Sequence, residues 1–214
     1  MKSLKVLFIL TLVFSLNLHA QVDTTKSNNL LDEITLEDKE VVPLLPSRMI
    51  ITQRLMWGKH GMMRNFDNFE LTPEKRQNEL KLRRTMLVTH QVLGFATMGA
   101  MIAQGIVGAK LYSNGGENLE DLHKNLAVAV NTGYFTAAGL SLFAPPKMVN
   151  ERKGYSSIKV HKWLALVHMT AMIATNVLAG QTEGPNGATY KPYHRAAAYT
   201  AFGAFAASMI IIKF

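Results

Sequence analysis

Four histidines stand at the start of apolar stretches, each in a similar five-residue segment. The histidine is followed by a polar or basic residue and, four positions on, by Gly or Ala. Ionisable side chains in membrane segments are costly and usually functional, and neutral imidazole is a common metal ligand. The pattern therefore indicates metal ligation by one histidine from each of four helices. The histidines are His90, His123, His161 and His194, and the small residues are Gly94, Ala127, Ala165 and Ala198.

The apolar stretches after these histidines predict the elements that position them. A helix needs about 20 apolar residues to cross a bilayer, and the shorter stretches reach this only if their histidine-bearing first turns lie in the interface. Gly or Pro clusters mark the ends of the first three stretches, and connections of roughly a dozen residues favour antiparallel neighbours. The sequence thus predicts an all-α membrane protein, a four-transmembrane-helix up-and-down bundle over residues 86–214. The four spans are expected at 86–109, 126–144, 163–180 and 196–212.

Three further segments precede the bundle. Residues 1–20 are typical of a signal peptide, with Lys2 and Lys5 before an apolar core; an uncleaved anchor is the alternative. Residues 21–46 are polar and predict a flexible linker. Residues 47–85 form an amphipathic helical segment, which either lies in the membrane interface or packs on the bundle end.

The composition excludes several kinds of metal and cofactor site. The chain has no cysteine, which excludes disulfides, cysteine-ligated iron–sulfur clusters, thiolate zinc sites and CxxCH-attached haem. Its net charge of +8 fits anionic lipid headgroups. No nucleic-acid-binding motif, GxSxG, P-loop or GxGxxG is present. We therefore expect membrane lipid as a partner, no nucleic acid and no catalytic residues of a soluble enzyme.

The order of the helices predicts which histidines meet. In an antiparallel bundle the first and third helices begin at one membrane face, and the second and fourth begin at the other. His90 should therefore lie level with His161, and His123 level with His194. At a rise of about 1.5 Å per residue, each histidine lies about 12–16 Å from the middle of its helix. This arrangement predicts two sites, one near each face of the membrane.

The neighbouring residues suit two b-type haems. A Gly or Ala four residues after the histidine lies on the same helix face and leaves room for a porphyrin edge. Lys124, Lys162 and Arg195 can reach the headgroup level and pair with haem propionates. Two axial imidazoles leave no open position for oxygen, so such haems would transfer electrons. His168, seven residues after His161, is a fifth candidate: it could replace His161 opposite His90, or hydrogen-bond a cofactor or quinone.

The four histidine segments and the order of the spans resemble the core of the cytochrome b561 superfamily. The resemblance covers residues 86–214. It implies two b-type haems, one held by His90 and His161 and the other by His123 and His194. It also implies electron transfer across the membrane, from donors such as ascorbate or quinol to acceptors such as ferric iron or a redox protein. The chain could serve as a quinol or metal reductase subunit, an oxidoreductase role, although its short N-terminal segment leaves donor and acceptor open.

Two other functions stay open on the sequence. The histidines could handle a transition metal or protons in a non-haem membrane protein, or the chain could be a structural subunit of a larger complex. A homodimer is a further alternative. We expect a multi-pass protein of a bacterial-type inner membrane whose exported N-terminal segment is periplasmic. Basic residues before the first span and between the second and third favour the opposite orientation.

Overall fold

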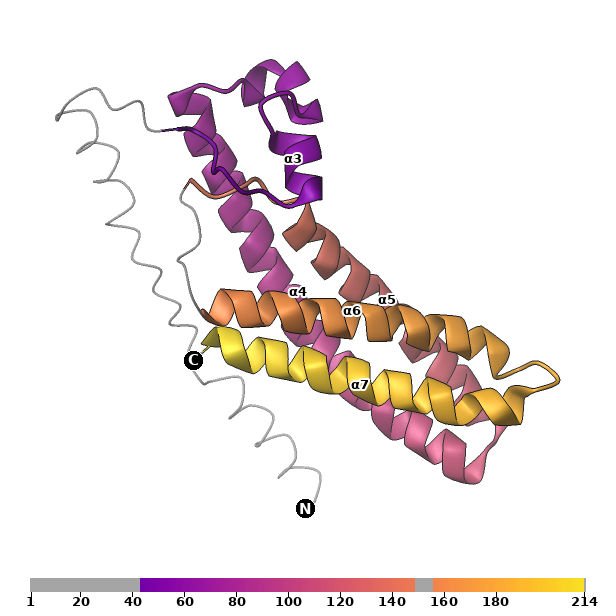
Figure 1. Cartoon of the computed structure of the whole chain (residues 1–214). Coiled ribbons are helices and arrows are strands. Elements are labelled where there is room, and N and C mark those ends of the chain that lie inside the picture. The colour runs from indigo at the N-terminus through magenta and orange to yellow at the C-terminus, as the bar shows by residue number, and fades with distance from the viewer. Residues whose placement is uncertain (1–42, 149–155, 214) are drawn as a thin grey trace. The chain divides into compact units, whose positions relative to one another are not determined.

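The computed structural model of the chain describes residues 43–148 and 156–213. The predicted signal peptide and most of the predicted linker lie outside these residues. The described residues form helices and turns and no strand, which confirms the all-α prediction. In order they are α3 (Ile51–Trp57), the 3₁₀ turns η1 (Met62–Asn65) and η2 (Asp67–Phe69), α4 (Pro73–Asn114), α5 (Glu117–Leu142), α6 (Ser157–Gln181) and α7 (Gly187–Lys213) (Figure 1).

Helix α4 runs without a break from a charged segment into the first apolar stretch. The Thr72 side chain accepts a hydrogen bond from the backbone N–H of Lys75, and Pro73 occupies the first helical position. The helix ends at Gly115, whose φ of 66° lies in the left-handed region that glycine tolerates. Only Gly115 and Gly116 separate α4 from α5. The expected connection of about a dozen residues was wrong, because both helices continue through polar turns beyond their apolar parts.

Three of the long helices are apolar and long enough to cross a membrane: α4, α6 and residues Gly187–Ile212 of α7. This indicates a multi-pass membrane protein. Helix α5 is about as long as α6 and α7, but four of its first eight residues are charged, and Asn125 and Asn131 lower the hydropathy of the remainder. A fourth span at α5 therefore stays a prediction.

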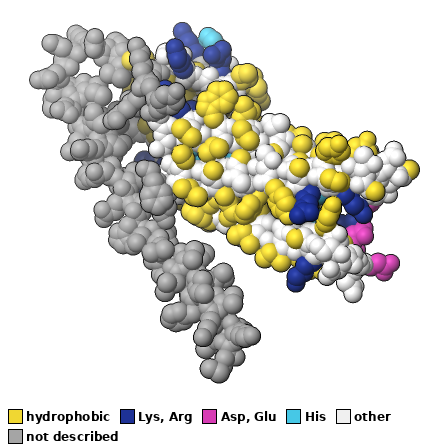
Figure 2. All heavy atoms as spheres, turned by 60° about the horizontal axis from the view of Figure 1, so that its bottom comes forward, with side chains coloured by type: hydrophobic (Ala, Val, Ile, Leu, Met, Phe, Trp, Pro, Cys, Tyr) yellow, Lys and Arg dark blue, Asp and Glu magenta, His cyan; other side chains and the backbone are white. Residues whose placement is uncertain are grey.

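The outer surface of these helices is apolar. Large side chains such as Val92, Trp163 and Val177 are exposed, and hydrophobic side chains cover much of the face seen in Figure 2. A water-soluble protein rarely exposes so much contiguous apolar surface, whereas lipid is its natural solvent. The interior holds a small cluster that joins the long helices: Met101, Val130, Tyr134, Ala171, Met172, Ala201 and Phe205.

The four long helices form two antiparallel hairpins. Helix α4 packs along α5, and α6 packs along α7 (Figure 1). Between the hairpins, the side-chain amides of Asn131 and Asn176 exchange two hydrogen bonds of 2.8 and 2.9 Å. Such amide pairs hold helices together where water is absent.

The two hairpins resemble one another in sequence. Residues 98–103 and 169–174 read Met-Gly-Ala-Met-Ile-Ala and Met-Thr-Ala-Met-Ile-Ala. The same offset of 71 positions relates His90 to His161 and His123 to His194. It also relates core residues to one another, as with Tyr134 and Phe205. The hairpins are therefore related by an approximate two-fold repeat, and each one supplies one histidine to each pair.

Residues 43–72, called the cap below, pack against the end of the first hairpin. The side chains of Thr52, Gln53 and Trp57 donate hydrogen bonds of 2.6, 3.1 and 2.9 Å to the backbone carbonyls of Leu142, Ala144 and Phe143. The predicted amphipathic segment, residues 47–85, consists of one short helix, two 3₁₀ turns and the start of α4. The side chains of Ile51 and Leu55 are exposed. Contact of this segment with the membrane interface therefore stays a prediction.

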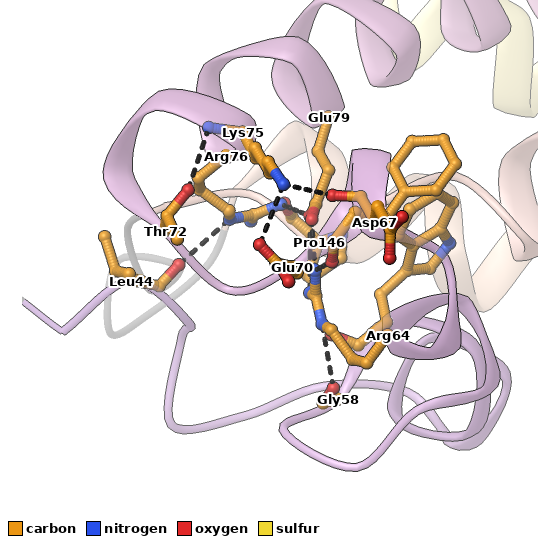
Figure 3. Close-up of polar contacts among 12 residues, drawn as sticks. Leu44, Gly58, Arg64, Asp67, Glu70, Thr72, Lys75, Arg76, Glu79 and Pro146 are labelled. Atoms are coloured by element: carbon orange, nitrogen blue, oxygen red, sulfur yellow. Dashed lines mark hydrogen bonds and ion pairs between the residues drawn. The ribbon is translucent and has the colours of Figure 1, made fainter.

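A buried ion network joins the cap to α4 (Figure 3). The carboxylate of Glu79, fully buried, pairs with the guanidinium groups of Arg64 and Arg76. Arg64 also donates to the carbonyl of Trp57 at 2.6 Å, and Arg76 donates to the carbonyl of Leu44 at 2.9 Å. Burial removes water from these charges, and the attraction within an ion pair alone compensates poorly for that cost. The extra hydrogen bonds to carbonyls help to offset it.

Candidate functional site

The four predicted histidines meet in two pairs. The ring centroids of His90 on α4 and His161 on α6 lie 6.4 Å apart, with the ring planes at 87°. The centroids of His123 on α5 and His194 on α7 lie 6.3 Å apart, with the planes at 76°. In each pair one ring comes from the first hairpin and the other from the second. These are the pairs that the helix order predicts.

Both separations fit one metal ion between two imidazoles. Metal–imidazole bonds are about 2.0 Å long, as in zinc sites, so two rings on one ion have centres roughly 6 Å apart. Plain edge-to-face ring contacts cover the same range of distance. The hydrogen bonds of the ring nitrogens indicate which nitrogen of each ring could bind a metal.

Three of the four histidines are held in a tautomer that can bind metal. The Nδ1 atom of His90 lies 2.8 Å from the carbonyl of Ala137, and that of His161 lies 3.0 Å from the carbonyl of Ser208. The Nδ1 atom of His194 lies 2.9 Å from the carbonyl of Thr175. A carbonyl only accepts, so each Nδ1 carries the proton and Nε2 keeps a lone pair for a metal. Each carbonyl belongs to the partner helix in the same hairpin.

His123 is held differently. Its Nε2 lies 3.3 Å from the amide nitrogen of Gln104, while its Nδ1 is buried with no hydrogen-bond partner among the described residues. Gln104 occupies the position equivalent to Thr175 in the repeat. His194 is held by the backbone carbonyl of Thr175, whereas His123 contacts the side chain of Gln104. Buried unpartnered nitrogens are rare and often mark a missing water or ion. Here the ring lies against α4, with Nε2 near Gln104 and Nδ1 on the side of Gly108.

Small residues make room at both pairs. Gly94, one turn after His90, is buried, yet a Cβ added there would meet no atom within 4 Å. Gly108 is the opposite case, because an added Cβ would lie 2.8 Å from Cε1 of His123. One glycine thus borders free space, and the other lets a histidine ring approach the α4 backbone. Ala127, Ala165 and Ala198 are half-buried at the positions equivalent to Gly94 on the other three helices.

The three predicted propionate partners already make contacts within the chain. Lys124 pairs with Glu120 at 2.8 Å and with Glu183 at 2.9 Å, and these hydrogen bonds raise the pKa of Lys124 above its ordinary value. The Arg195 guanidinium lies 4.7 Å from the ring centre of Tyr112 and 5.3 Å from that of Tyr199. Lys162 lines an open surface pocket on α6 with Lys159, Trp163 and Leu166.

His168 lies apart from both pairs. Its Nδ1 is 2.6 Å from the hydroxyl of Tyr134, and both side chains are buried against Phe205. On α6 it stands seven residues after His161 and seven before Thr175, which places it midway between the two pairs. The ring opposite His90 is therefore that of His161. Tyr134 was not predicted as a site residue, since one tyrosine in an apolar helix gives no signal of its partner.

Comparison with known proteins adds no relative: no family model, no curated protein and no solved structure matches the chain.

Proposed function

We propose that this protein is a transmembrane electron carrier with two b-type haems, one between His90 and His161 and one between His123 and His194. The observation that carries the proposal is the separation of about 6 Å between ring centres in both pairs. The α4–α6 pair and the α5–α7 pair reach nearly the same spacing, and each pair joins one helix of the first hairpin to one of the second.

The number of ligands favours haem over a bare metal ion. Within the described ranges, no three His, Asp or Glu side chains gather where they could hold a metal ion. A zinc site takes three or four protein ligands. In haem, the porphyrin supplies the equatorial nitrogens, so the protein supplies only axial ligands. Each pair contains two histidines that could fill these axial positions.

The residues around each pair would hold and insulate it. When bound, haem iron cycles between ferric and ferrous states and so carries one electron. The carbonyls of Ala137, Ser208 and Thr175 keep three imidazoles oriented with Nε2 free. On α6, Thr175 lies 14 residues after His161, which is about 21 Å along the helix. The two sites would thus stand near opposite faces of the membrane, as electron transfer across it requires.

We also propose that all four long helices, α5 among them, are inserted in a bacterial-type inner membrane with the cap on the periplasmic side. The function is similar to that of cytochrome b561 proteins. Quinol or a redox protein is the proposed class of electron donor, and a metal or a second redox protein the acceptor. The chain would work alone, as a homodimer or within a larger complex.

The optical spectrum of the purified protein tests this function. We expect a reducible b-type spectrum, about two haems per chain, and the low-spin signal of bis-imidazole iron in paramagnetic resonance. A colourless protein with bound zinc or copper would instead support metal handling by the histidines. A protein with neither haem nor metal would support a structural subunit.

A further inference from the structure

Arg83 continues the line of His90 along one face of α4. Positions 76, 83 and 90 are seven residues apart, close to two helical turns, so their side chains share a face. All three donate to carbonyls in α5 or just after it: Arg76 to Pro146, Arg83 to Pro145 at 2.6 Å, and His90 to Ala137 at 2.8 Å. Arg83 thus stands about 10 Å from His90 along α4, towards the membrane surface.

The charges around Arg83 do not balance. Glu79 is shared by Arg64 and Arg76, both already bound to it. Arg76 is close enough to Arg83 for the two charges to repel. Among residues 43–148 and 156–213, no carboxylate pairs with Arg83, although its side chain is half-buried. A partly desolvated cation without a counter-ion is unfavourable, so this place favours a bound anion.

The shape of the guanidinium selects the kind of anion. The side chain has five N–H donors in a planar fork, and the contact with Pro145 uses one nitrogen. A carboxylate matches two of the remaining donors in a bidentate pair. Near the other pair of histidines, Lys124 pairs with Glu120 and Glu183, whereas Arg83 has no such partner among the described residues.

We propose that Arg83 binds a carboxylate at the outer edge of the His90–His161 site. The inference rests on the proposed function, because the nearest source of that carboxylate is a propionate of the haem between His90 and His161. A soluble carboxylate, such as an anionic electron donor, offers the same chemistry. In either case Arg83 is a positioning residue and sets the charge next to one of the two haems.

The test measures the midpoint potentials of both haems in the full-length protein, for Arg83→Gln and for Arg84→Gln. Arg84 is the matched control, since it is the next residue but exposed. A positive charge stabilises the extra electron of the reduced iron, so its loss should lower the potential of one haem. We expect Arg83→Gln to lower only the potential of the haem that His90→Ala removes, and Arg84→Gln to change neither. Arg83→Lys keeps the positive charge but lacks the planar guanidinium, so it should give a smaller shift in potential. It replaces the glutamine variant if that variant does not fold.

Added acetate, compared with chloride at equal ionic strength, separates the two sources. For a propionate, the shift caused by Arg83→Gln is present in chloride and acetate changes nothing. For a soluble carboxylate, acetate changes the wild-type potential and Arg83→Gln abolishes that response. Two haems whose potentials are the same in Arg83→Gln as in Arg84→Gln would overturn the inference alone. A wild-type protein that binds no haem would overturn the proposed function as well.

Discussion

At the scale of single residues, the state of the ring nitrogens decides what the histidine pairs can do. Three histidines use Nδ1 to donate to a carbonyl, which fixes both the ring and its tautomer. His123 lacks this support and leans on α4 beside Gln104 and Gly108. The His123–His194 pair is therefore the more sensitive one to changes in its surroundings.

Gly108→Ala should impair that pair selectively. The added Cβ would lie 2.8 Å from Cε1 of His123, closer than carbon atoms approach, so the ring must move. We expect haem content to fall from about two per chain to about one, measured from the optical spectrum. Gly105→Ala is the control: it adds the same methyl group to the same helix, where nothing lies within 4 Å. Both changes raise helix propensity by up to about 1 kcal/mol, so a difference between them reports the clash. Two haems retained in Gly108→Ala would show that the ring does not need this glycine.

At the scale of elements, α4 links the cap to the His90–His161 site. Its first turns carry Arg76 and Glu79, and its middle carries His90. The cap is attached through the bonds of Thr52, Gln53 and Trp57 and through the Arg64–Glu79 pair. Movement of the cap would therefore be transmitted to the helix that carries His90.

Glu79→Gln should loosen the cap. The change leaves two buried guanidinium groups without a counter-ion, and removal of one partner from a buried pair costs about 3–5 kcal/mol. Since cleavage tracks the open population, trypsin should cut the cap about 100-fold faster, a ratio equivalent to about 3 kcal/mol. Glu70→Gln breaks a surface pair with Lys75, worth less than about 1 kcal/mol. Equal cleavage rates in the two variants would mean that the network does not hold the cap.

At the scale of the whole molecule, two similar hairpins face one another and share both histidine pairs. The apolar outer surface indicates lipid as the surroundings, and three of the long helices qualify as spans on length and hydropathy. Whether α5 also spans decides if the pairs lie near opposite faces of the membrane.

Single cysteines can test this arrangement, because the chain has none of its own. We place them at Lys59 in the cap, at Asn114 after α4 and at Asn186 before α7. With four spans, Asn114→Cys and Asn186→Cys lie on the same side and Lys59→Cys on the other. An impermeant maleimide should label only Lys59→Cys in spheroplasts, and the other two after permeabilisation. Labelling of Asn114→Cys and Asn186→Cys from opposite sides would contradict insertion of α5.

Features set by local chemistry or by helix order were predictable from the sequence. Thr72 and Pro73 mark the start of α4, because capping is a local interaction. The pairing of His90 with His161 followed from depth along antiparallel helices. The contacts of Arg83, Gly108 and Tyr134 could not be predicted, since they depend on how each helix is rotated about its axis. The short α4–α5 connection was missed because the end of an apolar stretch was taken as the end of a helix.

The haem content of four variants, each with one histidine changed to alanine, tests the central claim most directly. We expect His90→Ala and His161→Ala to lose the same haem, and His123→Ala and His194→Ala to lose the other. Each variant should keep about one haem per chain, and the spectrum of that haem reports that the protein is folded. If the two members of a pair lose different haems, or if any of the four variants keeps both, the histidines do not bind haem in the pairs described above.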